Sequence, residues 1–79
     1  MGRKEKLLEQ AKRSPSNFKF QDLLNLASHC GFEHIRQKGS HIMMGHSFYD
    51  LFLNFQEHRG KAKPYQVKQL LKMIEEYEL

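Results

Sequence analysis

The sequence has few of the features that mark secreted or membrane-bound proteins. Its 79 residues include one cysteine, Cys30, so no internal disulfide can form, which is usual in the reducing cytoplasm. No apolar run approaches the roughly 20 residues that a membrane span needs. The basic N-terminus is not followed by the apolar segment of a secretory signal. These absences predict a cytoplasmic protein with no membrane segment.

The sequence also lacks the spacings typical of metal sites. Its five histidines form neither a helical i, i+4 pair nor a combination with a paired-cysteine motif. We therefore expect no metal ion and no other cofactor. The histidines are His29, His34, His41, His46 and His58.

Negative charge is in short supply relative to positive charge. Lysine and arginine number 13 against 9 acidic residues, which gives a net charge of +4. This excess favours an anionic partner, such as RNA, DNA or an acidic protein surface. Hydrophobic residues make up 39% of the chain, enough for the small core of a single domain.

Helical periodicity is clear in three segments. Residues 3–13 have helix-forming composition but a narrow apolar stripe, and the SPSN stretch at 14–17 breaks the pattern. Residues 20–30 carry apolar side chains at i, i+3, i+4 and i+7, and Gly31 and Phe32 then provide a typical helix end. Pro64 starts the third helix, whose apolar face contains Val67, Leu70, Leu71, Ile74 and Tyr77.

Alternating patterns between the second and third helices predict three short strands, near 33–38, 41–47 and 48–57, with a loop at 58–63. In the first strand, Ile35 is expected on one face, and His34, Arg36 and Lys38 on the other. Met43 and Met44 should face opposite ways, one of them in the core. Of three nearby aromatic residues, two are expected in the core; the three are Phe48, Tyr49 and Phe52.

This order predicts an α+β fold, α-α-β-β-β-α, with a three-stranded antiparallel sheet. The helices should cover one sheet face, since neither element is stable alone, and leave the other face open. Residues 1–17 are predicted to form a helical extension and a turn, and residues 18–79 the functional domain.

The stretches "GF…RQKGSH" and "GKAKPYQVKQLLK" in this order resemble the HicA toxins over about residues 20–77. The resemblance implies a fold similar to a double-stranded-RNA-binding domain. It also implies a metal-independent endoribonuclease that cuts mRNA and inhibits translation, with a HicB-like antitoxin as partner. The histidine of its GSH motif falls on His41. Two departures from the family are the extra residues 1–17 and Ile42, where many relatives have a polar residue or a second histidine.

The chemistry expected of this stretch centres on His41. Histidine can transfer a proton near neutral pH, because its unperturbed pKa is about 6.5. We expect His41 to transfer the proton, and Arg36 and Lys38 to hold the phosphate, although charges on an open strand face need no such role. Ser40 is either a turn residue or a phosphate contact, and Gly39 serves the backbone geometry of the turn. The predicted RNA-binding set therefore consists of Arg36, Lys38, Gly39 and Ser40.

Some assignments have two interpretations in the sequence. His46 and His58 are the candidates for a second acid, and each is equally well a surface residue. Arg59, Lys61 and Lys63 either extend a phosphate-binding track or form a charged loop. The rival to the nuclease is a non-catalytic RNA-binding module of the same fold.

Overall fold

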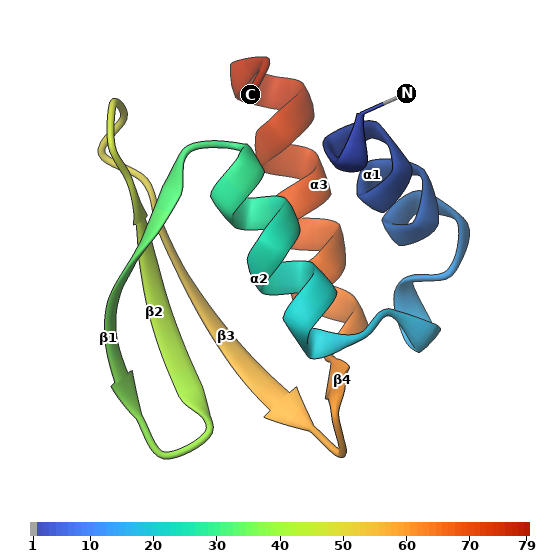
Figure 1. The fold of residues 1–79 in the computed structure, drawn as a ribbon. Coiled ribbons are helices and arrows are strands. Elements are labelled where there is room, and N and C mark those ends of the chain that lie inside the picture. Colours follow the sequence, from blue (N-terminus) through green and yellow to red (C-terminus); the bar gives the residue numbers. More distant parts are fainter. Residues whose placement is uncertain (1) are drawn as a thin grey trace.

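The computed structural model describes residues 2–79 as a single antiparallel sheet with helices on one side (Figure 1). The strand order is β1-β2-β3-β4. The elements are α1 (Arg3–Arg13), the 3-10 helix η1 (Pro15–Asn17), α2 (Phe20–His29), β1 (Phe32–Lys38), β2 (His41–His46), β3 (Phe52–His58), β4 (Lys61–Ala62) and α3 (Pro64–Tyr77). The predicted α+β class is confirmed, but the predicted strand number of three is wrong, because the sheet has four.

The fourth strand occupies part of the predicted loop at 58–63. Glu57 pairs with Ala62, and His58 pairs with Lys61. The outer edge of β4 is covered by the segment before α2, where the Ala62 N–H donates to the Phe18 carbonyl at 2.9 Å. Its partners in β3 are close in sequence, across a two-residue turn in which Arg59 and Gly60 both have positive φ, but a strand of two residues is too short to show an alternating pattern.

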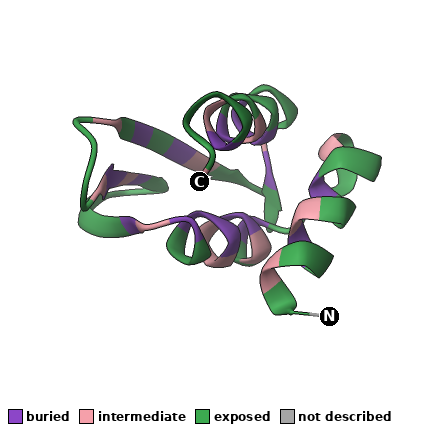
Figure 2. Cartoon of the chain, turned by 90° about the horizontal axis from the view of Figure 1, so that it is seen from above, coloured by how far each residue is buried: buried purple, intermediate pink, exposed green. Residues whose placement is uncertain are grey.

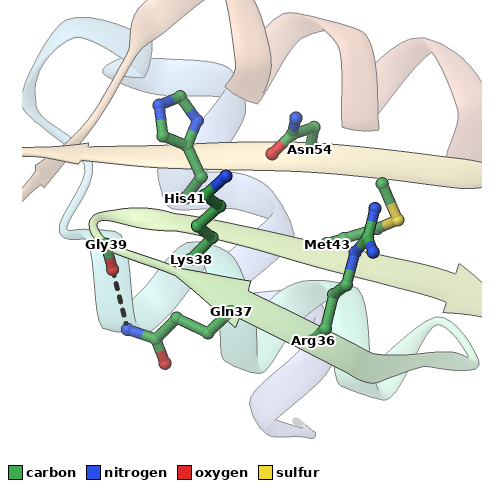
Figure 3. Close-up of a pocket in the computed structure, with 7 residues that line it drawn as sticks. All are labelled: Arg36, Gln37, Lys38, Gly39, His41, Met43 and Asn54. Carbon is green, nitrogen blue, oxygen red and sulfur yellow. Dashed lines mark hydrogen bonds between the residues drawn. The ribbon is translucent and has the colours of Figure 1, made fainter.

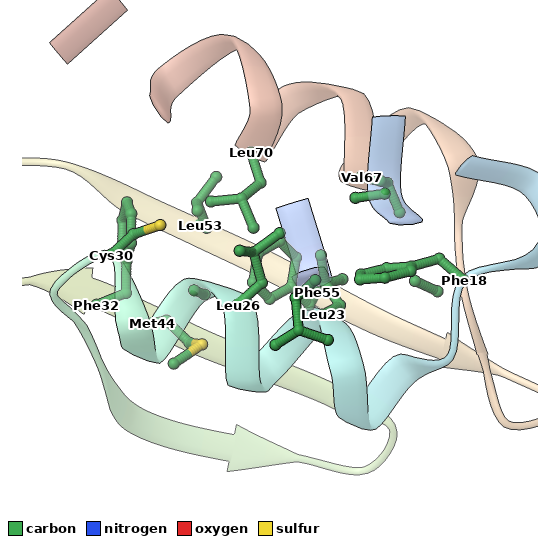
Figure 4. Packing of buried hydrophobic residues seen from close by; sticks show 14 of the residues in the cluster. Phe18, Leu23, Leu26, Cys30, Phe32, Met44, Leu53, Phe55, Val67 and Leu70 are labelled. Carbon is green, nitrogen blue, oxygen red and sulfur yellow. The ribbon is translucent and has the colours of Figure 1, made fainter. Parts of the chain in front are cut away.

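The core lies between the sheet and the helices (Figure 4). Met44, Leu53 and Phe55 point into it from the sheet, and the predicted stripe of α2 points into it from the other side. Of the stripe predicted for α3, Val67, Leu70 and Ile74 are buried, whereas Leu71 is half-buried and Tyr77 is exposed. Gly31 takes a positive φ of 99° and ends α2, as predicted. Burial raises the pKa of the Cys30 thiol, with a smaller opposing effect from Lys4, so Cys30 packs as a small apolar group.

Helix α1 packs on the same core. Its Leu7 and Ala11 are buried, and the helix contacts both α2 and α3. Lys4 also donates from Nζ to the carbonyl of Leu79 at 2.9 Å, which ties the two ends of the chain together. Seen from above, the buried residues gather on the inward sides of the helices (Figure 2). None of the helices within residues 2–79 is long and apolar enough to cross a membrane.

A β-bulge changes the faces predicted for β1. The pairing with β2 shifts between His34 and Arg36, so that Ile35 is the extra residue. His34 lies opposite the buried Met44 and therefore on the helix side, whereas Arg36 lies opposite Met43 on the other side. The prediction that His34 shares a face with Arg36 and Lys38 is therefore wrong.

The aromatic residues around the β2–β3 connection are all outside the core. Phe48 is 91% exposed, Phe52 57% and Tyr49 46%, although two of the three were expected inside. The two methionines behave as predicted, since Met44 is buried and Met43 lies on the side without helices. The sheet therefore has an uncovered face, called the open face below, on which residues of β1, β2 and β3 are accessible.

Candidate active site on the open sheet face

His41 begins β2 and occupies the middle of a row across the sheet. It pairs with Lys38 on β1 and with Gln56 on β3. Directly paired residues of antiparallel strands share a face, and Cβ atoms of such pairs are about 4.5–5.5 Å apart. The ammonium of Lys38 is thus held on the same side of the sheet as the exposed imidazole of His41.

A second lysine reaches this row from the β3 side, opposite Lys38 on β1. Lys63, which precedes α3, donates from Nζ to Oε1 of Gln56 at 2.7 Å. Gln56 therefore connects a cation from the predicted loop to the strand next to His41. We call Lys38, His41, Gln56 and Lys63 the His41 row; it carries an exposed imidazole with a lysine on each side.

The neighbouring row contains Arg36, Met43 and Asn54, paired in register. With the His41 row it surrounds a shallow hollow of about 680 Å³, in which Arg36, Lys38, His41, Met43 and Asn54 lie on one side of the strands (Figure 3). Gln37 lies opposite the buried Ile42 and donates from Nε2 to the Gly39 carbonyl at 3.1 Å. The hollow is open to solvent and carries two cationic side chains, those of Arg36 and Lys38.

The turn before His41 is held by its backbone. Gly39 has a positive φ of 61°, which fits the role predicted for it. The Ser40 carbonyl accepts a hydrogen bond from the Glu57 N–H at 3.2 Å, which attaches the turn to β3. These contacts fix where β2 begins and hence where His41 stands.

The cations of the open face have no carboxylate partners. Among the described residues 2–79, a single ion pair has a nitrogen–oxygen distance within 4 Å, and it joins Arg13 to Glu9 on α1. Arg36, Lys38 and Lys63 therefore keep their charge available for an external anion. A phosphate placed over His41 would stand between Lys38 and Lys63, where charge-assisted hydrogen bonds are strong.

His46, one of the two predicted second acids, does not join this group. It is five residues from His41 on the same strand, so it points to the opposite face, where its ring meets Phe32 edge-on at 5.1 Å. Nε2 bonds the Cys30 carbonyl at 2.9 Å and must be the donor, because a carbonyl only accepts. Nδ1 then accepts from the N–H groups of Phe48 and Tyr49, at 3.0 and 3.2 Å.

We expect His46→Ala to destabilise the fold without removing any group from the His41 row. It would leave the backbone groups that His46 bonds without their partner, at a cost of about 1–3 kcal/mol. Urea unfolding should show this loss, while His29→Ala, which removes an exposed imidazole at the end of α2, should leave stability within about 0.5 kcal/mol. Equal stabilities of the two variants would contradict the structural role.

His58, the other predicted second acid, is placed closer. It follows Gln56 by two residues and so lies on the same face. His58 is therefore the diagonal neighbour of His41, and diagonal neighbours in a regular ladder are about 7–8 Å apart. It also lines a second hollow of about 480 Å³ with Arg59, Lys61 and Lys63. The cations of the predicted loop thus continue from the His41 row along the end of the sheet.

Gln66 supports the row from behind, which the sequence prediction missed. This side chain is 4% exposed, accepts from the Gln56 N–H at 2.8 Å and donates to the Asn54 carbonyl at 2.9 Å. It thereby occupies the part of the β3 edge that β4 does not reach. The signal was a polar residue at the spacing of the apolar stripe, four residues before Leu70 and eight before Ile74.

In the described chain, residues 2–79, no three histidine, cysteine, aspartate or glutamate side chains are grouped as a metal site requires.

The comparison with protein families gives one result. Residues 20–75, more than half of the chain, match the family described as the HicA toxin of bacterial toxin–antitoxin systems. No curated protein and no solved structure matches the chain significantly. The matched residues include all four strands, all of α2 and most of α3, and begin after α1.

Proposed function

Because the chain belongs to the HicA family, the toxins of bacterial toxin–antitoxin pairs, we propose that it is a metal-independent endoribonuclease that cleaves mRNA. Cleavage of mRNA in the cytoplasm would stop translation. The observation that carries the proposal is the His41 row, in which an accessible imidazole stands between two lysines that have no carboxylate partners. We assign the activity to residues 18–79, with residues 1–17 as an extension.

The proposed reaction uses the RNA's own hydroxyl as nucleophile. The 2′-oxygen attacks the adjacent phosphorus, the bond from phosphorus to the 5′-oxygen breaks, and a 2′,3′-cyclic phosphate forms. One proton leaves the 2′-hydroxyl and one is delivered to the departing 5′-oxygen. His41 performs one of these transfers, and His58 is the nearest histidine on the same face for the other. Lys38, Lys63 and Arg36 stabilise the charge on the phosphate.

The direct test incubates the purified protein with single-stranded RNA in excess EDTA and identifies the new ends. A 2′,3′-cyclic phosphate and a 5′-hydroxyl are the expected products. A linear phosphate end without a cyclic precursor would mean attack by water instead. Binding without any cleavage would reject the nuclease.

That last outcome corresponds to the alternative function, a non-catalytic RNA-binding module. One observation favours it: His41 is exposed at the start of β2 and lines an open hollow, so its ring is not held in a packed pocket. Catalytic hydrogen bonds often form only in the complex with substrate, however, so this geometry is compatible with the nuclease. The cations bind phosphate under either function.

If the open face binds phosphates, removing its cationic side chains should make RNA affinity less dependent on salt concentration. Single-stranded RNA binding should lose about 0.7 from the slope of log affinity against log salt for each phosphate contact removed. Arg36→Ala combined with Lys38→Ala should therefore lower the slope by about 1.4. Lys68→Ala, on α3 and away from the open face, should leave it unchanged. A slope identical to the native one in the double variant would show that phosphates bind elsewhere.

An antitoxin is the partner that the family indicates. We propose that it is HicB-like and that it neutralises the toxin by covering the open face. A complex that leaves the His41 row accessible to RNA would contradict this mode of inhibition.

A further inference from the structure

Beyond the cationic rows, the open face ends in an apolar row. Phe52 of β3 pairs with Gly45 of β2, and the bulge of β1 brings Ile35 beside them. A Cβ atom placed on Gly45 would lie 2.6 Å from Cδ1 of Ile35 and 3.3 Å from Cε1 of Phe52. The two side chains therefore meet above Gly45, in space that any larger residue would fill. We call Ile35, Gly45 and Phe52 the apolar row.

The apolar row is not part of the core. Phe52 is 57% exposed and Ile35 49%, so an aromatic ring and an aliphatic side chain face solvent together. Because Ile35 is the extra residue of the bulge, Ile35 and the following Arg36 both lie on this face, where regular alternation would place only one of two successive residues. Bulges commonly re-aim a side chain next to a functional site.

The charges show which part of an RNA fits this end of the face. Lysine and arginine are confined to the first two rows, and the residue that pairs with Gly45 from β1 is Glu33, a carboxylate. A phosphate would be repelled by Glu33 and would find no cation here. An uncharged base, in contrast, gains by covering the Phe52 ring.

The spacing connects this end to the proposed cleavage site. His41 and Gly45 are four residues apart on β2, on the same face, which corresponds to about 13 Å along the strand. Met43 lies between them. A strand of RNA whose backbone follows the cationic rows therefore has a base within reach of Phe52 when a nearby phosphate is at His41.

We propose that the apolar row is a base-stacking subsite, in which Phe52, supported by Ile35, stacks an unpaired base close to the scissile phosphate. Stacking on a protein ring needs a base that has left its duplex, so the substrate is single-stranded at this position. This inference rests on the proposed function for its substrate, and it adds a position at which the enzyme reads the RNA.

The test is a double-mutant cycle between Phe52 and the RNA. A labelled single-stranded RNA with one main cleavage position is made with an abasic site at each position around the cut in turn. Native protein is assayed by kcat/KM, and His41→Ala protein by affinity, each with and without Phe52→Ala. At one position, loss of the base and loss of the ring should each cost about tenfold, and together no more than either alone.

Three further variants separate stacking from packing. Phe52→Trp should keep the coupling and Phe52→Leu should lose it, because leucine restores apolar surface but no ring. Gly45→Ala keeps Phe52 but pushes its ring and Ile35 apart, and should weaken the same coupling. Phe48→Ala is the control, since Phe48 is more exposed but lies beyond the strands; it should show no coupling to that base. Circular dichroism verifies that each variant is folded.

The outcomes distinguish the subsite from the nuclease. Coupling in affinity without any cleavage supports the subsite and rejects the nuclease. Cleavage with independent effects of ring and base at every position overturns the subsite and leaves the nuclease standing. The subsite is also overturned if Phe52→Ala leaves RNA affinity unchanged and instead weakens the complex with a co-expressed HicB-like antitoxin.

Discussion

Replacing His41 by alanine should lower the rate of RNA cleavage by about 10²–10⁴, the usual effect of a positioned general acid or base. RNA affinity should stay close to that of the native protein, because the lysines on either side of His41 remain. The ring is exposed, so stability should change by no more than about 0.5 kcal/mol. The measurement is single-turnover cleavage at saturating protein, alongside urea unfolding.

The matched control is His34→Ala. His34 is an exposed histidine of the same sheet, but it lies opposite Met44 on the helix side. The His34→Ala variant should cleave RNA at the native rate. Added imidazole should restore part of the activity of His41→Ala, since the variant leaves space where the ring stood. Full activity of His41→Ala would remove His41 from the mechanism and make His58 the next histidine to replace.

His58→Ala should also reduce cleavage if the second proton transfer is its own. Its diagonal position on the open face makes it the other histidine that can take part, and His46 is excluded by its position on the opposite face. Comparison of the single and double variants is informative, because residues that act together in one step have strongly non-additive effects.

The helices were predictable because their signals are local. The apolar residues of α3 predicted most of its buried face, and Pro64 predicted where α3 begins. Gly31, which has a positive φ, predicted where α2 ends. These features depend on residues within one or two turns of each other. The sequence order also placed His41 next to the turn, which the structure reproduces.

The open face was harder to predict, because it depends on register. Alternation assigns His34, Arg36 and Lys38 to one side, but a single inserted residue at Ile35 moves His34 to the other. Nothing in the composition of β1 marks the bulge. The exposure of Phe52 has a similar cause: the aromatic ring suggests a core position, but the register of β3 places it on the open face.

The contribution of Lys63 and Gln66 arises from tertiary contacts. Both are close in sequence to the start of α3, but each acts on β3 through a side-chain hydrogen bond. The pattern shows a polar residue within an apolar stripe, and only the structure shows that this residue completes the edge of β3. The family match covers both residues, but a match over a range of residues does not show these contacts.

Gln66→Ala should therefore cost about 2–4 kcal/mol of stability, one of the larger losses available outside the apolar core. The substitution leaves the Gln56 N–H and the Asn54 carbonyl, two backbone groups on a protected strand edge, without their partner. For a domain of this length, a change of that size lowers Tm by roughly 10–25 °C. Urea and thermal unfolding measure the loss.

Gln69→Ala provides the matched control, because Gln69 is an exposed glutamine on the same helix. It should change stability by no more than about 0.5 kcal/mol. Amide exchange adds a local test: in Gln66→Ala the Gln56 amide should exchange faster even under conditions where the protein stays folded. Since Gln56 pairs with His41 and holds Lys63, cleavage should fall as well. Equal stability and exchange in the two variants would mean that the β3 edge holds its position without Gln66.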